Sequence, residues 1–335
     1  MGIAAFLIGI LVAACVGSPA TSSSPTTTPD AGLLRIATTV SPITSIVENI
    51  GGTRIVVQGI VPEGINSHTF EPAPSVARIL SNADLIVLNG LFLEEPTRRM
   101  AEANLKSGGV ILLLGDTAIT PGQWKFDFSF PQSQGNPNPH LWPDPILGLK
   151  YAELVRDELS RLDPDNADYY AANYEVFKAR IEDFDRRIQS VIATVPEPNR
   201  RLLTYHDSWA YFAERYGMEV IGAVQPSDFT EPSARDVANL IDQVRDLGVP
   251  AIFGSEVFPS EVMEQIAKEG GAKFIDELRD DDLPGKPGDS RHSYLGLLVA
   301  NMEVMMSALG GDPSALAGFD TGPVFQGQST ATYPQ

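Results

Sequence analysis

The sequence of 335 residues is poor in cysteine, histidine and basic residues, and each scarcity excludes something. The single cysteine cannot form a disulfide within the chain, so the fold must be held together by its hydrophobic core. Lys and Arg number 24 against 43 Asp and Glu, and the net charge of -19 would repel nucleic acid, so we expect no nucleic-acid partner. Hydrophobic residues make up 43% of the chain, and this length favours two hydrophobic cores over one.

The apolar run from Ile3 to Ala14 is too short to span a bilayer and is typical of the core of a signal peptide. It leads into Val12-Ala13-Ala14-Cys15, which resembles a bacterial lipobox, so residues 1–15 are predicted to be a signal peptide and Cys15 to carry a lipid. An ordinary secretory signal with a chance cysteine is the alternative. Residues 16–32 are rich in Ser, Thr and Pro and predict a flexible tether. We therefore expect a protein anchored by lipid on the extracytoplasmic face of the cell membrane, or in the periplasm.

Short apolar runs alternate with amphipathic stretches after the tether, a pattern typical of βαβ units. They fall into two series, residues 33–163 and 197–312, and each series predicts an α/β lobe with a doubly wound sheet. Residues 164–196 are predicted to be a linking helix, because Asp165 to Val195 keeps apolar residues at helical spacing without Gly or Pro. Such a helix is about 45 Å long and permits only small hinge motion. Residues 313–335 have little periodicity and predict a frayed tail.

Three of the four histidines are candidate ligands, and two of them fall directly at positions that parallel sheets use for ligands. His68 follows the second predicted strand, His140 lies in the long loop that ends the first series, and His206 directly follows a strand of the second series. Ligands bind beyond the carboxyl ends of strands in open α/β sheets. Asp276 stands at the end of another strand of the second series. Two ligands from each lobe would then converge on the cleft between the lobes.

Three neutral imidazoles and one carboxylate suit zinc in tetrahedral geometry, and imidazole favours zinc, copper or nickel over calcium and magnesium. All four ligands come from the protein, which favours binding over catalysis. Each histidine alone could equally be a solvated loop residue, since no pair has the close spacing of a motif such as HExxH. Asp280, Asp281 and Asp282 compete with Asp276 for the carboxylate position. His292, at the start of a predicted helix, is interpreted as a surface residue.

Five ordered segments resemble the zinc and manganese solute-binding proteins of ABC transporters, the cluster A-I family of bacterial metal-binding lipoproteins. The resemblance covers roughly residues 33–312 and implies two α/β lobes around a metal site. It implies that His68 and His140 are the ligands of the first lobe, and that His206 and Asp276 are those of the second. The segments are Gly64–Pro74 (GINSHTFEPAP), Pro139–Asp144 (PHLWPD), Thr204–Gly217 (TYHDSWAYFAERYG), Glu231–Ser233 (EPS) and the stretch around Asp276.

The resemblance also bears on the choice of metal. In the family a glutamate at the third ligand position tends to accompany manganese and a histidine tends to accompany zinc, so His206 favours zinc, with manganese or iron as alternatives. Zinc-binding members often carry a loop rich in histidine and acids before the second ligand. Here the corresponding stretch, Thr117 to Pro139, has no histidine and carries Trp124, Phe126, Phe128 and Phe130 instead.

The expected function is capture of a divalent transition metal, zinc first, and its delivery to the permease of an ABC importer. The protein would be a monomer without enzymatic activity, closing its lobes around the metal and releasing it on docking. Affinity would fall as the histidines take up protons near pH 6.

Three rival interpretations remain. A metal-dependent hydrolase needs an open coordination position and a general base, and the sequence shows a motif for neither. A binding protein for an organic ligand would need aromatic and Arg groups in the cleft instead of converging histidines. A role in cell adhesion, proposed for some family members, could coexist with transport.

Overall fold

The structure, a computed structural model, describes residues 1–2, 32–255, 257 and 261–334. The chain divides into two units, Met1–Gly32 and Leu33–Gln335, and the helices and strands described here all belong to the second. Residues 3–31 lie outside the described residues, and these include Cys15, most of the predicted signal peptide and all of the predicted tether but Gly32.

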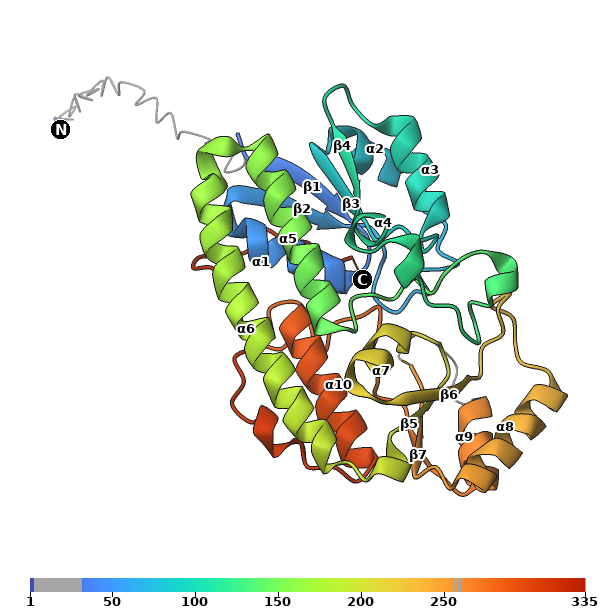
Figure 1. Cartoon of the computed structure of the whole chain (residues 1–335). Helices are drawn as coiled ribbons and strands as arrows, with labels where there is room; N and C mark the ends of the chain where they lie inside the picture. Colours follow the sequence, from blue (N-terminus) through green and yellow to red (C-terminus); the bar gives the residue numbers. More distant parts are fainter. Residues whose placement is uncertain (3–31, 256, 258–260, 335) are drawn as a thin grey trace. The chain divides into compact units, whose positions relative to one another are not determined.

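The first lobe is a four-stranded parallel sheet with helices on both faces (Figure 1). Its strands are β1 (Leu34–Thr38), β2 (Ile55–Gly59), β3 (Leu85–Leu88) and β4 (Val110–Leu113). Its helices are α1 (Ser41–Gly51), α2 (Val76–Asn82), α3 (Glu95–Asn104), α4 (Leu114–Ala118) and α5 (Pro145–Leu162). The strand order is β2-β1-β3-β4, and every residue of β3 is buried because its side chains pack against helices on either face.

The second lobe repeats this arrangement. Its strands are β5 (Arg201–Thr204), β6 (Glu219–Ala223), β7 (Ala251–Phe253) and β8 (Lys273–Ile275), and its helices are α7 (Ala210–Tyr216), α8 (Ala234–Leu247), α9 (Glu261–Gly270) and α10 (Tyr294–Ala308). The order β6-β5-β7-β8 is also parallel throughout. In both lobes the first strand therefore lies between the second and the third, so the loops after corresponding strands lie at corresponding edges.

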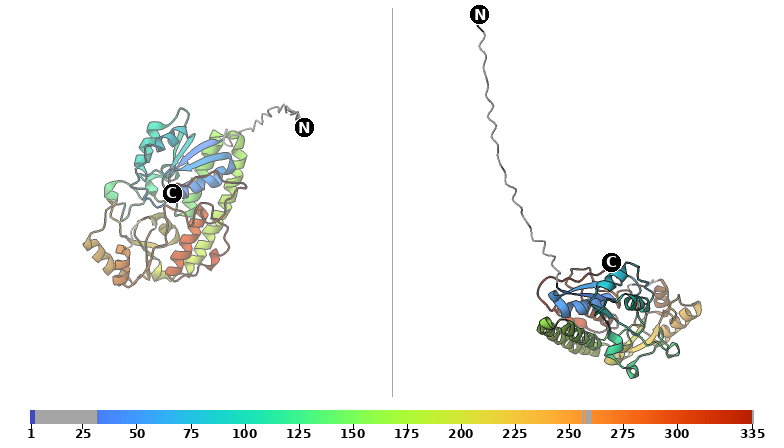
Figure 2. Two further views of the ribbon diagram at one scale, coloured as in Figure 1. Left: turned by 180° about the vertical axis from the view of Figure 1, so that it is seen from behind. Right: turned by 90° about the horizontal axis from the view of Figure 1, so that it is seen from above.

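A single helix, α6 (Ala167–Thr194), runs along both lobes (Figures 1 and 2). Its 28 residues bury one face, since Tyr170, Phe177 and Phe184 recur at helical spacing and are fully buried. The predicted fold class, two α/β lobes joined by one long helix, is confirmed.

One buried hydrophobic cluster spans both lobes, and another lies within the second lobe alone. The largest buried cluster joins residues of the first sheet to residues of α6, α7 and α10. Polar contacts reinforce this link at the start of α10, where the backbone N–H of Tyr294 donates to Ser45 Oγ of α1 at 2.9 Å. The Tyr294 hydroxyl donates to the carbonyl of Trp142 at 2.6 Å. Relative motion of the lobes must therefore distort a packed core.

The end of the chain is ordered against the first lobe, so the prediction of a frayed tail is wrong. Thr332 extends the first sheet beyond β2: its carbonyl accepts from the N–H of Gly59 at 2.9 Å, and its N–H donates to Val57 O at 3.0 Å. Phe325 is buried in the same segment. The outer edge of strand β2 has backbone N–H and C=O groups that no other strand pairs, and the tail forms hydrogen bonds with them. Such backbone pairing needs no periodic pattern of side chains.

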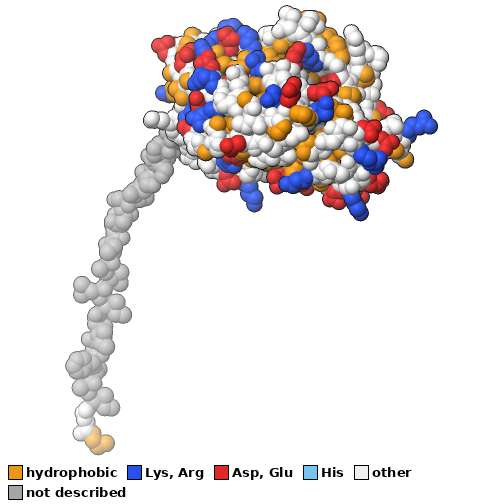
Figure 3. Space-filling model, turned by 60° about the horizontal axis from the view of Figure 1, so that its bottom comes forward, with side chains coloured by type: hydrophobic (Ala, Val, Ile, Leu, Met, Phe, Trp, Pro, Cys, Tyr) orange, Lys and Arg blue, Asp and Glu red, His pale blue; other side chains and the backbone are white. Residues whose placement is uncertain are grey.

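Charged side chains of both signs are interspersed on the face of the molecule in Figure 3. Several ion pairs of the protein form along helices, as that of Arg98 with Glu102 does. The acidic excess therefore gathers into no single patch on that face. Within the described residues, no helix has both the length and the apolar composition needed to cross a membrane.

Candidate metal site

Three histidines from the two lobes meet at the carboxyl ends of the two sheets. His68 lies in the loop after β2, His140 in the loop between α4 and α5, and His206 two residues after the end of β5. Their Nε2 atoms are 3.1 Å apart for His68 and His140, 3.1 Å for His68 and His206, and 3.0 Å for His140 and His206. Three of the four predicted site residues are thus brought together.

The orientation of His140 is fixed by Asn138. The Nδ1 atom of His140 lies 2.8 Å from Asn138 Oδ1, which also accepts from the backbone N–H of His140 at 3.0 Å. The amide nitrogen of Asn138 donates to Asp207 O and to Asp127 Oδ2, so its oxygen must face the imidazole. His140 therefore carries its proton on Nδ1 and presents the Nε2 lone pair to the other two histidines.

His206 is held in the same way by Gln225, whose Oε1 lies 2.7 Å from Nδ1. Both residues are buried. Sequence reasoning missed Asn138 and Gln225. The only signal for Asn138 is its place two residues before His140, and Gln225, two residues after the end of β6, has none.

The Nε2 lone pairs of His140 and His206 therefore converge on one point beside Nε2 of His68. Imidazoles that keep their protons on Nδ1 cannot hydrogen-bond to one another through Nε2, so close approach of the lone pairs is unfavourable by itself. A cation placed between the three nitrogens turns this repulsion into three bonds. The donor set thus fits a metal ion with nitrogen-preferring chemistry.

All three imidazoles are biased towards the neutral form that metal binding requires. Burial lowers the pKa of His68 and of His140 well below the usual 6.5, and the neighbouring His206 acts in the same direction. Burial also lowers the pKa of His206, although Asp280 and Gln225 oppose this shift. At neutral pH protons therefore compete weakly with a metal for these nitrogens.

A buried acidic segment after β8 completes the surroundings of the histidines. Asp280 Oδ2 lies 4.0 Å from His206 Nε2. Asp281 Oδ2 accepts from the backbone N–H of Ser67, the residue before His68, at 3.2 Å. Burial, with the charge of Asp280 adding to it, raises the pKa of Asp281 well above its usual value. Asp281 therefore links the second lobe to the loop that carries His68, while Asp280 lies beside His206.

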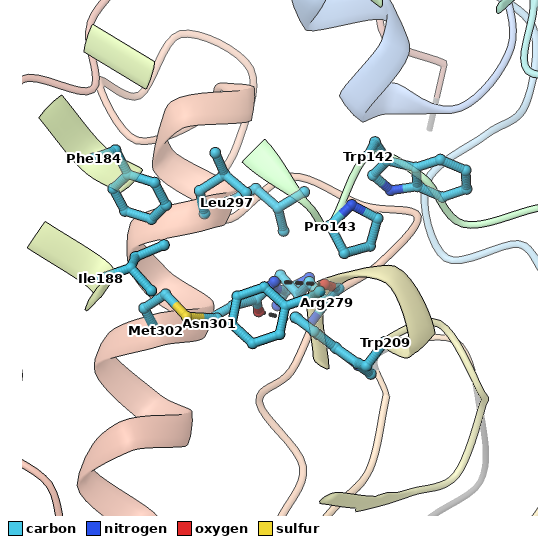
Figure 4. A pocket seen from close by; sticks show the side chains of 11 residues that line it. Trp142, Pro143, Phe184, Ile188, Trp209, Arg279, Leu297, Asn301 and Met302 are labelled. Carbon is cyan, nitrogen blue, oxygen red and sulfur yellow. Dashed lines mark hydrogen bonds between the residues drawn. The ribbon is translucent and has the colours of Figure 1, made fainter. Parts of the chain in front are cut away.

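The backbone of this acidic segment is anchored from two sides. Trp142 Nε1 donates to the carbonyl of Asp280 at 2.7 Å. Asn301 of α10 accepts from the N–H of Arg279 at 3.0 Å and donates to its carbonyl at 2.7 Å (Figure 4). These contacts hold Asp280 in place beside His206.

Asp276 does not belong to this group, although it follows β8 directly as predicted. Its side chain is exposed, and the cluster of potential metal ligands among the described residues consists of the three histidines. The chain continues for three more residues before Asp280 enters the buried site. In this structure the carboxylate beside His206 is thus that of Asp280 and not that of Asp276.

The interpretation of His292 as a surface residue is also wrong. Its side chain is buried, packs edge-on against Tyr333 with ring centroids 4.8 Å apart, and has Nε2 3.7 Å from Glu63 Oε1. The ordered tail that carries Tyr333 covers it.

The apolar pocket in Figure 4 offers no room for an organic ligand. Trp142, Trp209 and Arg279 line it together with residues of α6 and α10, and it leaves a gap of about 10 Å³. This space holds a single water at most. The pocket instead packs α10 against the loop that positions Asp280.

Two parallel-sheet lobes, a long linking helix and a histidine cluster between the lobes define a class, the extracytoplasmic solute-binding proteins of metal ABC transporters. Residues 36–308 match the family described as zinc-uptake complex component A, periplasmic, and the chain belongs to this family. The family and the transport function predicted from the sequence are thereby confirmed: the chain is the metal-binding component of an ABC transporter.

Named relatives of the chain differ in their metal. The manganese-binding lipoprotein MntA of Halalkalibacterium halodurans is 29% identical over 304 residues, covering 91% of this chain and 98% of that protein. The iron ABC transporter substrate-binding lipoprotein MtsA of Streptococcus pyogenes serotype M1 is 26% identical over 307 residues, covering 91% and 96%. The structure of the periplasmic zinc-binding protein TroA from Treponema pallidum aligns with a TM-score of 0.75 at 26% identity, covering 83% and 99%.

Proposed function

We propose that this protein captures zinc with His68, His140, His206 and a carboxylate of the acidic segment, and passes it to the permease of an ABC importer. Manganese or iron bound by the same residues is the alternative. The observation that carries the proposal is the triangle of Nε2 atoms with edges of 3.0 and 3.1 Å.

The size of this triangle fits a small divalent ion. Its centre lies about 1.8 Å from each nitrogen, whereas a Zn–N bond measures about 2.0–2.1 Å. A zinc ion would thus stand about 1 Å out of the plane of the nitrogens, as tetrahedral coordination with a fourth ligand on that side requires.

Asp280 is our assignment for the fourth ligand. Its Oδ2 is 4.0 Å from His206 Nε2, and its backbone is anchored by Trp142 and Asn301. Zinc–carboxylate bonds are about 2.0–2.2 Å, so a small rotation of the side chain or slight closure of the site suffices. Asp281, which accepts from Ser67, is the competing carboxylate.

Zinc is favoured over manganese because imidazole nitrogens supply three of the four ligands. Manganese prefers carboxylate, carbonyl and water oxygens. His206 is the decisive residue, since a glutamate at this position would shift the ligand set to two nitrogens and two carboxylates.

Anchoring through Cys15 is part of the proposal. The residues Val12 to Cys15 resemble a lipobox, and the relatives MntA and MtsA are described as lipoproteins. A lipid anchor would keep a monomeric binding protein beside its permease at the extracytoplasmic face. Four protein ligands leave no open coordination position, which argues against hydrolysis at the bound metal.

Calorimetric titration of metal-free residues 33–335 with zinc, manganese and ferrous iron tests the proposal. We expect one tight site per chain, tightest for zinc, and a loss of at least a hundredfold in affinity in His206→Ala. The matched control is His292→Gln, which removes the buried histidine outside the cluster and should leave affinity within about threefold. Tighter binding of manganese than of zinc would show that manganese is the transported metal. An unaltered zinc affinity in His206→Ala would refute the proposed site.

A further inference from the structure

Two phenylalanine rings lie against the histidine cluster. Phe229 stacks on His68, with ring centroids 4.7 Å apart and an angle of 22° between the planes. Phe130 lies with its centroid 5.5 Å from His68, 5.7 Å from His140 and 6.1 Å from His206. The two phenylalanines contact each other edge-on at 6.1 Å. Together they form an aromatic cap, Phe130 and Phe229, over the cluster.

The cap lies where the cluster is open to solvent. His140 and His206 are buried, with 1% and 3% of their surface exposed, and only His68 is partly exposed. Phe229 covers the face of this one ring, and Phe130 is itself buried against all three histidines. The aromatic cap therefore covers the partly exposed side of the cluster, that of His68.

The two rings come from different lobes. Phe130 belongs to the loop between α4 and α5, and Phe229 to the loop between β6 and α8. The loops are joined by polar contacts, because Ser129 Oγ donates to Gln225 O at 2.8 Å and Gln134 Nε2 donates to Ser227 Oγ at 2.8 Å. Phe229 and Gln225, which orients His206, thus lie in one loop.

The backbone of Phe229 is in the left-handed region, with φ of 58°. Residues with a bulky side chain rarely adopt this conformation, and such strain gathers at binding sites and moving segments. Two local hydrogen bonds support it: the N–H of Phe229 donates to Pro226 O at 3.0 Å, and the N–H of Thr230 donates to Asp228 Oδ1 at 3.2 Å. Phe229 itself is only partly buried, so its ring can swing outward without opening the core.

We propose that Phe229 is the gate of the metal site: its ring moves away to let the ion in or out and covers the site between these events. Phe130 is the fixed wall against which it closes. The closed rings leave no space for a metal still held by an organic chelator. Once the ring of Phe229 has moved, the ion exchanges its water ligands for the three Nε2 atoms and the carboxylate. This proposal rests on the proposed metal-binding function.

The test is the rate of zinc exchange, measured by stopped flow with a fluorescent zinc chelator as the competitor. Phe229→Gly removes the ring and suits the positive φ, so it should fold as the parent does. We expect zinc dissociation and association each to accelerate at least tenfold, with the dissociation constant unchanged within about threefold. Phe229→Tyr keeps an aromatic ring at this position and should exchange zinc as slowly as the parent protein. Phe128→Ala is the matched control, since Phe128 lies in the same loop as Phe130 but is 51% exposed.

The outcomes separate the gate from its alternatives. Unchanged exchange rates in Phe229→Gly would overturn the proposal. Faster dissociation with unchanged association would also overturn it, because the ring would then stabilise the bound state instead of controlling passage. Failure of the parent protein to bind zinc, manganese or iron would refute the proposed function itself, and the equilibrium titration reveals this before any rate is measured.

Discussion

Asn138 Oδ1 lies 2.8 Å from Nδ1 of His140 and is turned towards it by two hydrogen bonds from its own amide nitrogen. A partner of this kind fixes the tautomer and the ring orientation of a metal ligand. Asn138→Ala should therefore weaken zinc binding about 10- to 100-fold while the ligands stay in place. Calorimetric titration measures this, with Asn104→Ala in α3 as the control. Equal zinc affinities of the Asn138→Ala and Asn104→Ala variants would show that zinc binding by His140 does not depend on its contact with Asn138.

The carboxylate ligand can be identified by three parallel substitutions. Asp280→Asn should lower zinc affinity by a hundredfold or more, because Asp280 is the carboxylate beside His206. Asp276→Asn, at the exposed position after β8, should leave affinity unchanged and serves as the control. Asp281→Asn should have a smaller effect through its contact with Ser67. The assignment fails if Asp281→Asn or Asp276→Asn is the more damaging change.

Zinc affinity should resist acidification more than ordinary histidines would allow. Three imidazoles with the usual pKa of 6.5 would lose roughly sixfold in affinity between pH 7.5 and pH 6.5 through proton competition alone. The lowered pKa values of His68 and His140 predict a loss of less than about threefold over this interval, with the steep decline at lower pH. Titrations at pH 7.5, 6.5 and 5.5 test this. A sixfold loss already at pH 6.5 would contradict the lowered values.

The same shifts predict that the metal-free protein loses stability in acid. Below pH 6.5 the histidines of the unfolded chain take up protons, whereas His68 and His140 in the folded chain do not until their lowered pKa is reached. Stability should therefore fall by about 1 kcal/mol per buried histidine for each pH unit below 6.5. Urea unfolding at pH 7.5 and 5.5 measures the fall, and His140→Gln should reduce it. A fall of the same size in that variant would exclude His140 as a source.

The pairing of the tail with β2 should contribute measurably to stability. Thr332→Pro removes the N–H that donates to Val57 O at 3.0 Å, and leaves that carbonyl without its partner. We expect a loss of about 1–3 kcal/mol in the free energy of unfolding. Thr332→Ala keeps the N–H and should cost much less. Similar stabilities of the two variants in urea titrations would show that the tail adds nothing.

The sequence by itself determined the two α/β lobes, the linking helix and the three histidines. Apolar periodicity is a local property of the sequence and predicts where the strands lie. Because ligands bind beyond the carboxyl ends of parallel strands, the predicted strand ends then indicate candidate site residues. His68 and His206 each stand in a loop that this rule selects, and the resemblance of the segment Pro139–Asp144 to the family added His140. They could therefore be named before their distances were known.

Tertiary structure alone decided which carboxylate lies beside the histidines, where the tail goes and what covers the site. Asp280 replaces Asp276 because a segment without periodicity turns inward after β8, held by Trp142 and Asn301 from distant parts of the chain. The tail pairs with β2 through backbone groups that every residue possesses, so no side-chain pattern predicts this pairing. Phe130 and Phe229 meet only because the two lobes bring their loops together, and contacts between loops of different lobes leave no periodic trace in the sequence.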